Sequence, residues 1–159
     1  NVEEDTFEQG IIAGVIARPP LAPYDVLIVG AGSADGVYEG MRVFSRLIPV
    51  GVVESVAERS SRIVLFSTTG KTTDGWVGEK RHPISLRGNG AGTFEADVAR
   101  ESGVIEGDQV YLPGAGSYPV GVVVKIESEP SSPRAVVSVR PFANPFTMTS
   151  VSILASPSP

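Results

Sequence analysis

Apolar and polar residues alternate with a period of two in short runs along this chain, and Gly, Pro and Ser separate the runs. Such alternation is typical of strands with one buried and one solvated face. In residues 93–99, one face carries Phe94, Ala96 and Val98, and the other carries Glu95 and Asp97. The pattern predicts strands at residues 10–18, 24–30, 41–45, 49–58, 62–67, 76–81, 84–87, 93–99, 109–112, 119–127, 134–140 and 147–154.

The run at residues 119–127 has the clearest alternation among the longer strands. Its apolar β-branched residues recur at every second position, so one face of the sheet should carry Val120, Val122, Val124 and Ile126. The opposite face should carry Gly121, Val123, Lys125 and Glu127.

The chain contains an internal repeat. Residues 36–43 (GVYEGMRV) return without a gap as residues 103–110 (GVIEGDQV), and residues 49–53 (PVGVV) return letter for letter as residues 119–123. Residues 62–65 (RIVL) are answered by residues 134–137 (RAVV). Because turn and strand sequences recur in the same order, we infer that one supersecondary unit was duplicated.

Six half-buried strands in each copy suit a small closed barrel, in which one face fills the interior and closure removes the exposed edges. The predicted fold is therefore all-β, with two similar six-stranded β-barrels in tandem from an internal duplication. We place the first barrel at residues 10–81 and the second at residues 82–155. Residues 1–9 are interpreted as the end of a helix or a disordered segment, and residues 156–159 as a tail.

Glycines recur at equivalent positions of the two copies, and we predict a structural role for them. In the repeated Gly-Val-x-Glu-Gly turn they would supply a positive φ, which a β-carbon penalises. The predicted structural turn glycines are Gly36, Gly40, Gly51, Gly103, Gly107 and Gly121.

Composition narrows the classes of function. The chain has 13 Lys and Arg against 18 Asp and Glu, a formal net charge of -5, and no basic patch of the density that nucleic-acid binding requires. The absence of cysteine excludes a disulfide framework, a thiolate zinc site and a cysteine nucleophile. With one histidine and singly spread carboxylates, we expect no metal site and no cofactor. The sequence contains no apolar run of about 18 residues, so it does not predict a membrane span.

Residues 25–36 (DVLIVGAGSADG) resemble the start of a dinucleotide-binding unit, in which glycines precede a helix that binds pyrophosphate. The third glycine comes one residue late, and Gly40 and Pro49 interrupt the required helix. We therefore interpret this segment as a strand and a turn. Residues 70–72 (GKT) likewise lack the earlier glycine of a phosphate-binding loop, because position 65 is Leu.

His82 is the only histidine, so a serine triad would have to use it, with Asp97 or Asp108 and with Ser117. A pair of β-barrels is also the architecture of chymotrypsin-like proteases, although fold alone does not determine function. A double-barrel serine hydrolase using His82 is therefore one alternative function. A barrel domain of a secretion or membrane-fusion adaptor is another.

The chain resembles the extracytoplasmic part of the rod shape-determining protein MreC family. The resemblance is carried by the order of short motifs at residues 15–19 (VIARP), 35–37 (DGV), 51–53 (GVV), 107–110 (GDQV), 114–121 (GAGSYPVG) and 151–154 (VSIL). One departure lies at residues 111–114 (YLPG), where the family usually has Thr-Ser-Gly before the same loop. This departure affects the conformation of a turn.

The resemblance implies a non-enzymatic scaffold of the bacterial cell-elongation machinery, which maintains cell shape by binding peptidoglycan-synthesis proteins outside the cytoplasmic membrane. The implied partners are a class B penicillin-binding protein, the membrane proteins MreD and RodZ, and the actin-like MreB through the membrane. It also implies an N-terminal membrane anchor that these residues do not include, an extracytoplasmic location, and residues 1–9 as the end of a coiled coil.

A scaffold needs a contact surface in which a few aromatic side chains dominate the binding energy. Tyr24, Tyr38 and Tyr118 lie in or next to predicted turns, where a barrel interior does not absorb them. We predict them as partner-binding residues, although each could equally pack over its own turn. Self-association by strand addition at an exposed edge is a second predicted route of assembly.

Overall fold

The computed structural model describes residues 10–18, 25–90, 92–112 and 119–155. Within these ranges twelve strands are found, as predicted, but the one predicted at residues 76–81 lies instead at residues 72–77, because residues 78–81 form a turn. A single turn of 3-10 helix, η1 (Ser33–Asp35), follows the second strand. The strands are β1 (Ile11–Ala17), β2 (Val26–Val29), β3 (Arg42–Ser45), β4 (Ile48–Val56), β5 (Ser61–Leu65), β6 (Thr72–Val77), β7 (His82–Gly90), β8 (Thr93–Ala99), β9 (Gln109–Tyr111), β10 (Gly121–Ser128), β11 (Arg134–Pro141) and β12 (Ser150–Leu154).

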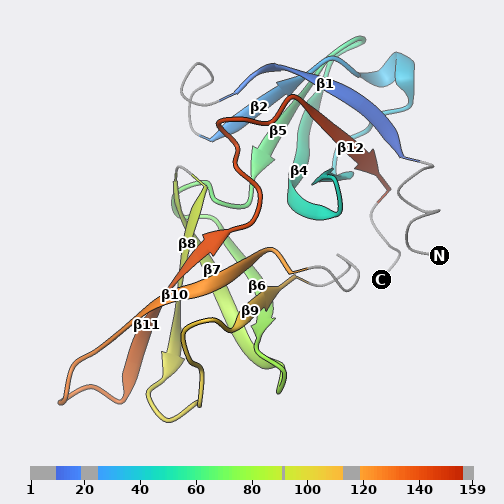
Figure 1. Cartoon of the computed structure of the whole chain (residues 1–159). Coiled ribbons are helices and arrows are strands. Elements are labelled where there is room, and N and C mark those ends of the chain that lie inside the picture. The colour runs from blue at the N-terminus through green and yellow to red at the C-terminus, as the bar shows by residue number, and fades with distance from the viewer. Residues whose placement is uncertain (1–9, 19–24, 91, 113–118, 156–159) are drawn as a thin grey trace.

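The strands close into two six-stranded antiparallel barrels, as the sequence pattern predicts (Figure 1). The first barrel has the order β1-β12-β3-β4-β5-β2, and the second has the order β10-β11-β8-β7-β6-β9. Because both sheets are closed, neither leaves an unpaired edge among these strands. Strand addition at an open edge, the second route predicted for self-association, therefore has no template in the described strands.

The two halves of the sequence exchange their sixth strands: β6 belongs to the second barrel and β12 to the first. This corrects the predicted domain boundaries. β6 lies within the proposed first domain, residues 10–81, yet it pairs with β7 and β9 of the second barrel. β12 lies within the proposed second domain, residues 82–155, yet it pairs with β1 and β3 of the first barrel. In Figure 1 the chain crosses between the barrels after β5 and again after β11. Neither half of the sequence contains a complete barrel.

The internal repeat is visible in the strand pairing. Around each barrel, β3, β4 and β5 of the first copy occupy the places of β9, β10 and β11 in the second. The register between the last two strands shifts between Val53 and Ser55 in one copy and between Val123 and Lys125 in the other. A bulge at the same repeat position is a feature that a shared ancestral unit explains.

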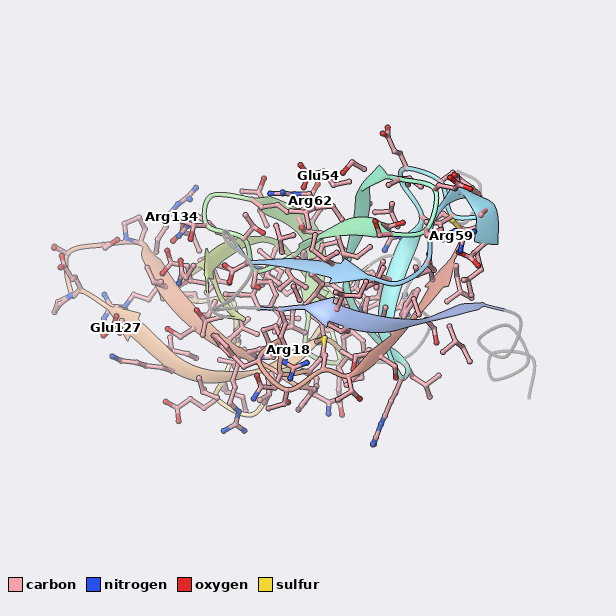
Figure 2. All side chains as sticks on the ribbon, turned by 90° about the horizontal axis from the view of Figure 1, so that it is seen from above. Arg18, Glu54, Arg59, Arg62, Glu127 and Arg134 are labelled. Carbon is pink, nitrogen blue, oxygen red and sulfur yellow. The ribbon has the colours of Figure 1, made fainter. Side chains whose placement is uncertain are left out.

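Each barrel has its own apolar core. The first is filled by residues such as Leu27, Val43 and Ile63, together with Val151 and Ile153 from β12. The second core includes the predicted inward face of β8, formed by Phe94, Ala96 and Val98, together with Val77 from β6. Figure 2 shows the side chains that fill the barrels, with the labelled Glu54, Arg62, Glu127 and Arg134 at the periphery.

Two predictions about β10 and β11 are wrong, and the bulge and the hairpin length explain them. Val123 is buried in the core, Val122 is half-buried and Val124 is exposed, because the bulge reverses the alternation predicted for residues 119–127. The hairpin of the second copy is also longer than that of the first. Arg62 pairs with Ser55 just beyond the first bulge, and Ser138 pairs with Lys125 just beyond the second. Residues 62–65 are therefore not the counterpart of residues 134–137.

The repeated Gly-Val-x-Glu-Gly turn has the predicted conformation in both copies. Gly36 and Gly40 have φ values of 91° and 90°, and Gly103 and Gly107 have values of 83° and 94°. The second glycine of each turn donates its N–H to the second strand after the turn, at 2.9 Å from Gly40 to the carbonyl oxygen of Val53 in β4, and at 2.8 Å from Gly107 to that of Val123 in β10. The prediction of left-handed turn glycines is confirmed at these four positions.

Gly51 and Gly121 are structural, but they are not turn glycines. Gly51 lies inside β4 and Gly121 begins β10. A β-carbon on Gly51 would overlap the carbonyl oxygen of Val64, and one on Gly121 would crowd the carbonyl oxygen of Arg140. Glycine is therefore required here by close backbone approach within the barrel wall.

Candidate partner-binding surface

Of the three tyrosines predicted to bind a partner, the structure describes one. Tyr38 is 54% exposed in the loop before β3, and its backbone N–H lies 3.3 Å from the sulfur of Met41. Its counterpart in the repeat, Ile105, is 63% exposed. Tyr24 and Tyr118 lie outside the described residues. Both copies thus present a large apolar side chain to solvent at the third position of the repeated turn.

The glycine-rich segment that resembles a dinucleotide-binding motif has a different use. The N–H groups of Ser33 and Ala34 donate to the carbonyl oxygens of Ala57 and Glu58 at 2.9 and 3.0 Å. A β-carbon on Gly32 would overlap that same backbone. Because η1 spans three residues and no long helix follows Gly36, the helix N-terminus that a pyrophosphate requires is not formed.

The carboxylates proposed to orient His82 have other partners. Asp97 accepts a hydrogen bond from Arg87, and Asp108 accepts the backbone N–H of Ile105 at 3.0 Å. His82 begins β7 opposite Val77 and makes no side-chain hydrogen bond within the described ranges. Ser117 lies outside the described residues. The hydrogen-bonded relay on which the hydrolase alternative depends is therefore not formed between His82 and these carboxylates.

An open groove of about 570 Å³ runs along the outer face of β12, on the first barrel where it meets the second. Its floor includes Ser150 and Ser152, short side chains on the strand that crossed from the second copy. On one side lies Ile12 of β1, and on the other lie Ser45, Arg46 and Ile48 of the β3–β4 hairpin. The far wall is the connection between β11 and β12, residues 142–149. We call this the β12 groove.

The connection that forms the far wall is fixed to both barrels. At its start, the N–H of Phe142 donates to the carbonyl oxygen of Val120 at 3.0 Å. At its end, the carbonyl oxygen of Met148 accepts from the guanidinium of Arg18 at 3.0 Å, and that of Thr149 accepts the N–H of Val15 at 2.9 Å. The Met148 side chain is buried in the first core. The groove is therefore a preformed feature of the fold.

Exposed apolar side chains gather at the β12 groove. Ile12 is 74% exposed and Phe142 is 44% exposed, and both line the groove. Arg46 is the only charged residue among the described residues that line it. The groove therefore combines exposed apolar side chains with hydroxyl groups and one arginine, and protein-binding surfaces commonly mix apolar and polar groups in this way.

A cluster on the second barrel was missed from the sequence. The rings of Trp76 on β6 and Tyr111 on β9 stack with centroids 5.9 Å apart and planes 12° from parallel. The guanidinium of Arg81 lies 5.2 Å from the Trp76 ring centroid. β6 and β9 share only a short ladder, in which Trp76 faces Tyr111 and Val77 faces Val110. The stacked rings therefore reinforce the seam that closes the barrel.

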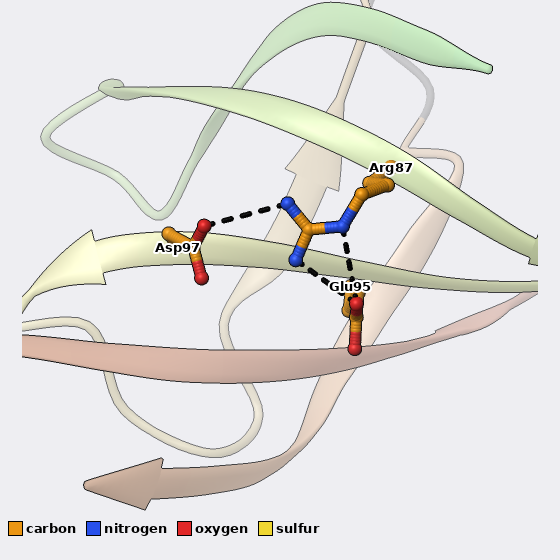
Figure 3. Close-up of polar contacts among 3 residues, drawn as sticks. All are labelled: Arg87, Glu95 and Asp97. Carbon is orange, nitrogen blue, oxygen red and sulfur yellow. Dashed lines mark hydrogen bonds and ion pairs between the residues drawn. The ribbon is translucent and has the colours of Figure 1, made fainter. Parts of the chain in front are cut away.

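The outer face of β7 and β8 carries a charge network (Figure 3). The guanidinium of Arg87 donates to Glu95 at 2.9 and 3.1 Å and to Asp97 at 3.4 Å. The hydrogen bonds to Glu95 and then to Asp97 raise the pKa of Arg87 above its usual value. On β10, the hydrogen bond to Glu127 raises the pKa of Lys125. These groups are paired with one another and lie away from the β12 groove.

The described residues hold no group of three or more His, Asp or Glu placed to bind a metal ion. They also hold no helix with the length and hydropathy of a membrane span.

Comparison with known proteins matches residues 15–155 to the family described as rod shape-determining protein MreC, barrel core. A curated relative, the cell shape-determining protein MreC of Haemophilus influenzae, is 28% identical over 126 residues, which is 74% of this chain. The chain spans 35% of the length of that relative.

Solved structures share the fold. The crystal structure of MreC from Pseudomonas aeruginosa superposes with a TM-score of 0.83 at 23% identity, covering 92% of this chain and 99% of that one. MreC of Helicobacter pylori, solved in complex with the penicillin-binding protein PBP2, has a TM-score of 0.63 at 13% identity, covering 90% of this chain and 96% of that one. At these identities the likeness concerns the arrangement of the two barrels.

Proposed function

The chain belongs to the rod shape-determining protein MreC family, and from this membership we propose that it acts as a non-enzymatic scaffold of the bacterial cell-elongation machinery. In that role it maintains cell shape by holding peptidoglycan-synthesis proteins together outside the cytoplasmic membrane. Because the chain spans about a third of the length of its curated relative, the activity of the longer protein is part of this proposal.

The partner that we propose for these two barrels is the ectodomain of a class B penicillin-binding protein. The MreC protein of Helicobacter pylori was solved bound to a penicillin-binding protein, and this chain covers 96% of it. The shared fold supports a similar use of the barrels here. MreD, RodZ and, through the membrane, MreB are the further partners we propose for a membrane-anchored form of the protein.

The observation that carries the proposal is the collection of exposed apolar side chains at the β12 groove. Ile12 and Phe142 line a preformed hollow, whereas the other large apolar side chains exposed on the described surface, such as Ile105 and Val124, lie on separate loops and strands. Exposed apolar surface that gathers in one place marks an interaction site more often than scattered residues do.

Binding between this chain and the soluble ectodomain of the class B penicillin-binding protein from the same organism tests the proposal. We expect saturable binding in biolayer interferometry, and co-purification of the same enzyme with the longer, membrane-anchored protein. The ectodomain of an unrelated membrane protein serves as the control. Capture of secretion or efflux components in place of the penicillin-binding protein would favour the adaptor alternative and would contradict the scaffold proposal.

A further inference from the structure

We propose that the β12 groove binds an aromatic side chain that a partner protein inserts over Ser152. That the partner is a penicillin-binding protein rests on the function proposed above. The chemistry of the groove is argued separately, from a comparison that the molecule makes possible by itself: the second barrel contains the same site, and there the chain fills it.

The strand registers identify the two sites as counterparts. In the first barrel Ile153 pairs with Val43 of β3, and in the second Val77 pairs with Val110 of β9, which is the repeat counterpart of Val43. The preceding residue of each exchanged strand is therefore also equivalent, which matches Ser152 with Trp76.

The neighbouring strand gives the same correspondence. Ser152 pairs with Ile12 of β1, and Trp76 pairs with Pro83 of β7. Each pair lies on the outer face of its barrel, one position from a buried core residue, Ile153 or Val77. The position that forms the floor of the β12 groove thus carries the only tryptophan of the chain in the other barrel.

In the second barrel this position is occupied from within. The Trp76 ring stacks on Tyr111 and is covered by the guanidinium of Arg81 at 5.2 Å. In the first barrel the counterpart of Tyr111 is Phe44, which pairs with Ser152 and is itself 4% exposed, whereas Ser152 supplies no ring and Ile12 at its side is 74% exposed. Of the two stacked rings of the second barrel, the first barrel therefore lacks the one that Trp76 supplies.

A second pair of counterparts points the same way. The N–H of Phe66 donates to Val50, and the N–H of Phe142 donates to Val120, the repeat counterpart of Val50, both at 3.0 Å. Phe66 is buried in the core of the barrel that the chain enters, whereas Phe142 stays 44% exposed at the groove wall. The first barrel therefore leaves two aromatic positions open that the second barrel closes.

The groove also has a cation available. Arg46 lines it, at the tip of the β3–β4 hairpin, where a φ of 56° fixes the backbone in the left-handed region. A guanidinium over an aromatic face is a favourable arrangement, and Arg81 over Trp76 shows it on this molecule. An inserted ring would lie between Ile12, Phe142 and Arg46.

Filling the groove from within tests the proposal. Ser152→Trp places at the first barrel the residue that its counterpart already carries, so we expect it to fold with an unchanged or higher melting temperature. We expect its affinity for the penicillin-binding protein ectodomain to fall by at least about tenfold, because the inserted ring takes the place of the partner's. Ser85→Trp, at an exposed position on the outer face of β7, is the matched control and should bind as the native chain does.

Two further variants guard against misfolding of the first. Phe142→Ala and Arg46→Glu change exposed side chains, and each should weaken binding while leaving the melting temperature within about 2 °C of the native value, as surface substitutions do. Native affinity in Ser152→Trp together with native affinity in both of these variants overturns the groove as the docking site, while the proposed function stands.

Titration with a small aromatic probe tests the proposed aromatic site independently of the proposed function. Titration with N-acetyl-tryptophanamide should shift the NMR amide signals of Ile12 and Ser152 in the native chain, and the Ser152→Trp variant should suppress the shift at Ile12. If the ectodomain does not bind at all, the proposed function fails, and the titration then decides whether the groove takes aromatic rings. Absence of these shifts overturns that inference. A native dimer that Ser152→Trp dissociates in sedimentation overturns it too, because a second copy would then be the occupant.

Discussion

The exchange of sixth strands predicts that a core mutation near the end of the second copy will destabilise the first barrel. Ile153 on β12 is fully buried in the first core, and it pairs with Ile11 and Val43. We expect Ile153→Ala to loosen β1 and β3. The strands nearest to Ile153 along the chain are β10 and β11, and they should keep their native protection.

The size of the effect follows from the burial of this side chain. At about 0.8 kcal/mol per buried methylene, removing the carbons beyond Cβ costs about 2.4 kcal/mol in transfer free energy. The cavity that remains raises the loss in free energy of unfolding to about 3–4 kcal/mol. For a chain of this size, each kcal/mol corresponds to about 2–4 °C, so the melting temperature should fall by about 6–16 °C.

Hydrogen exchange read residue by residue by NMR locates the loss. Backbone amides of β1, β3 and β4 should exchange faster in Ile153→Ala, because local opening of the first barrel then requires less free energy. The mirror variant, Val77→Ala on β6, should instead weaken β7 and β9 of the second barrel. Faster exchange confined to β10 and β11 in the first variant would falsify the strand exchange.

Three further predictions follow from the barrel walls. Gly51→Ala should lower the free energy of unfolding, measured in urea, by more than about 2 kcal/mol, because its β-carbon overlaps the Val64 carbonyl. Gly14→Ala should be nearly neutral, because no atom lies within 4 Å of its β-carbon. Equal effects of the two substitutions would contradict the close approach at Gly51. Trp76→Ala should lower the free energy of unfolding by about 2 kcal/mol through loss of the stacked ring. An unchanged free energy of unfolding would show that the seam between β6 and β9 does not depend on the ring. Arg87→Met should lower the free energy of unfolding by at most about 1 kcal/mol, less at high salt, because the Arg87 side chain is 37% exposed. Since pairing raises the pKa of Arg87 in the folded state, its contribution is complete below the unfolded pKa of arginine and is lost only as the pH rises through the folded value; a loss between about pH 5 and pH 9 would contradict this assignment.

Within this sequence, local physics determines where the strands lie and how the repeated turn is built. The alternation at residues 93–99 predicts the buried face of β8 residue by residue. The doubled Gly-Val-x-Glu-Gly turn predicts left-handed glycines in both copies, and it also indicates a duplicated barrel. These features depend on a residue and its near neighbours, so the sequence is enough.

The candidate site depends on contacts that no local pattern encodes. The bulge between Val123 and Lys125 changes which alternate residues of β10 face the core: Gly121 and Val123 are buried before it, whereas Ile126 packs against the core after it. The groove exists because Ser152 occupies a place that Trp76 fills in the other barrel, and only the register shows that these residues correspond.

The partner of each sixth strand was likewise decided by the tertiary structure. β6 and β12 each carry one buried face, and the pattern shows that they need a barrel without showing which one. Because the barrels are copies with the same strand order, either offers nearly the same wall, so the alternation of apolar residues contains no preference between them. The connections after β5 and β11 carry the chain across, and at the start of each a backbone hydrogen bond, from Phe66 to Val50 and from Phe142 to Val120, holds it to the barrel that it leaves.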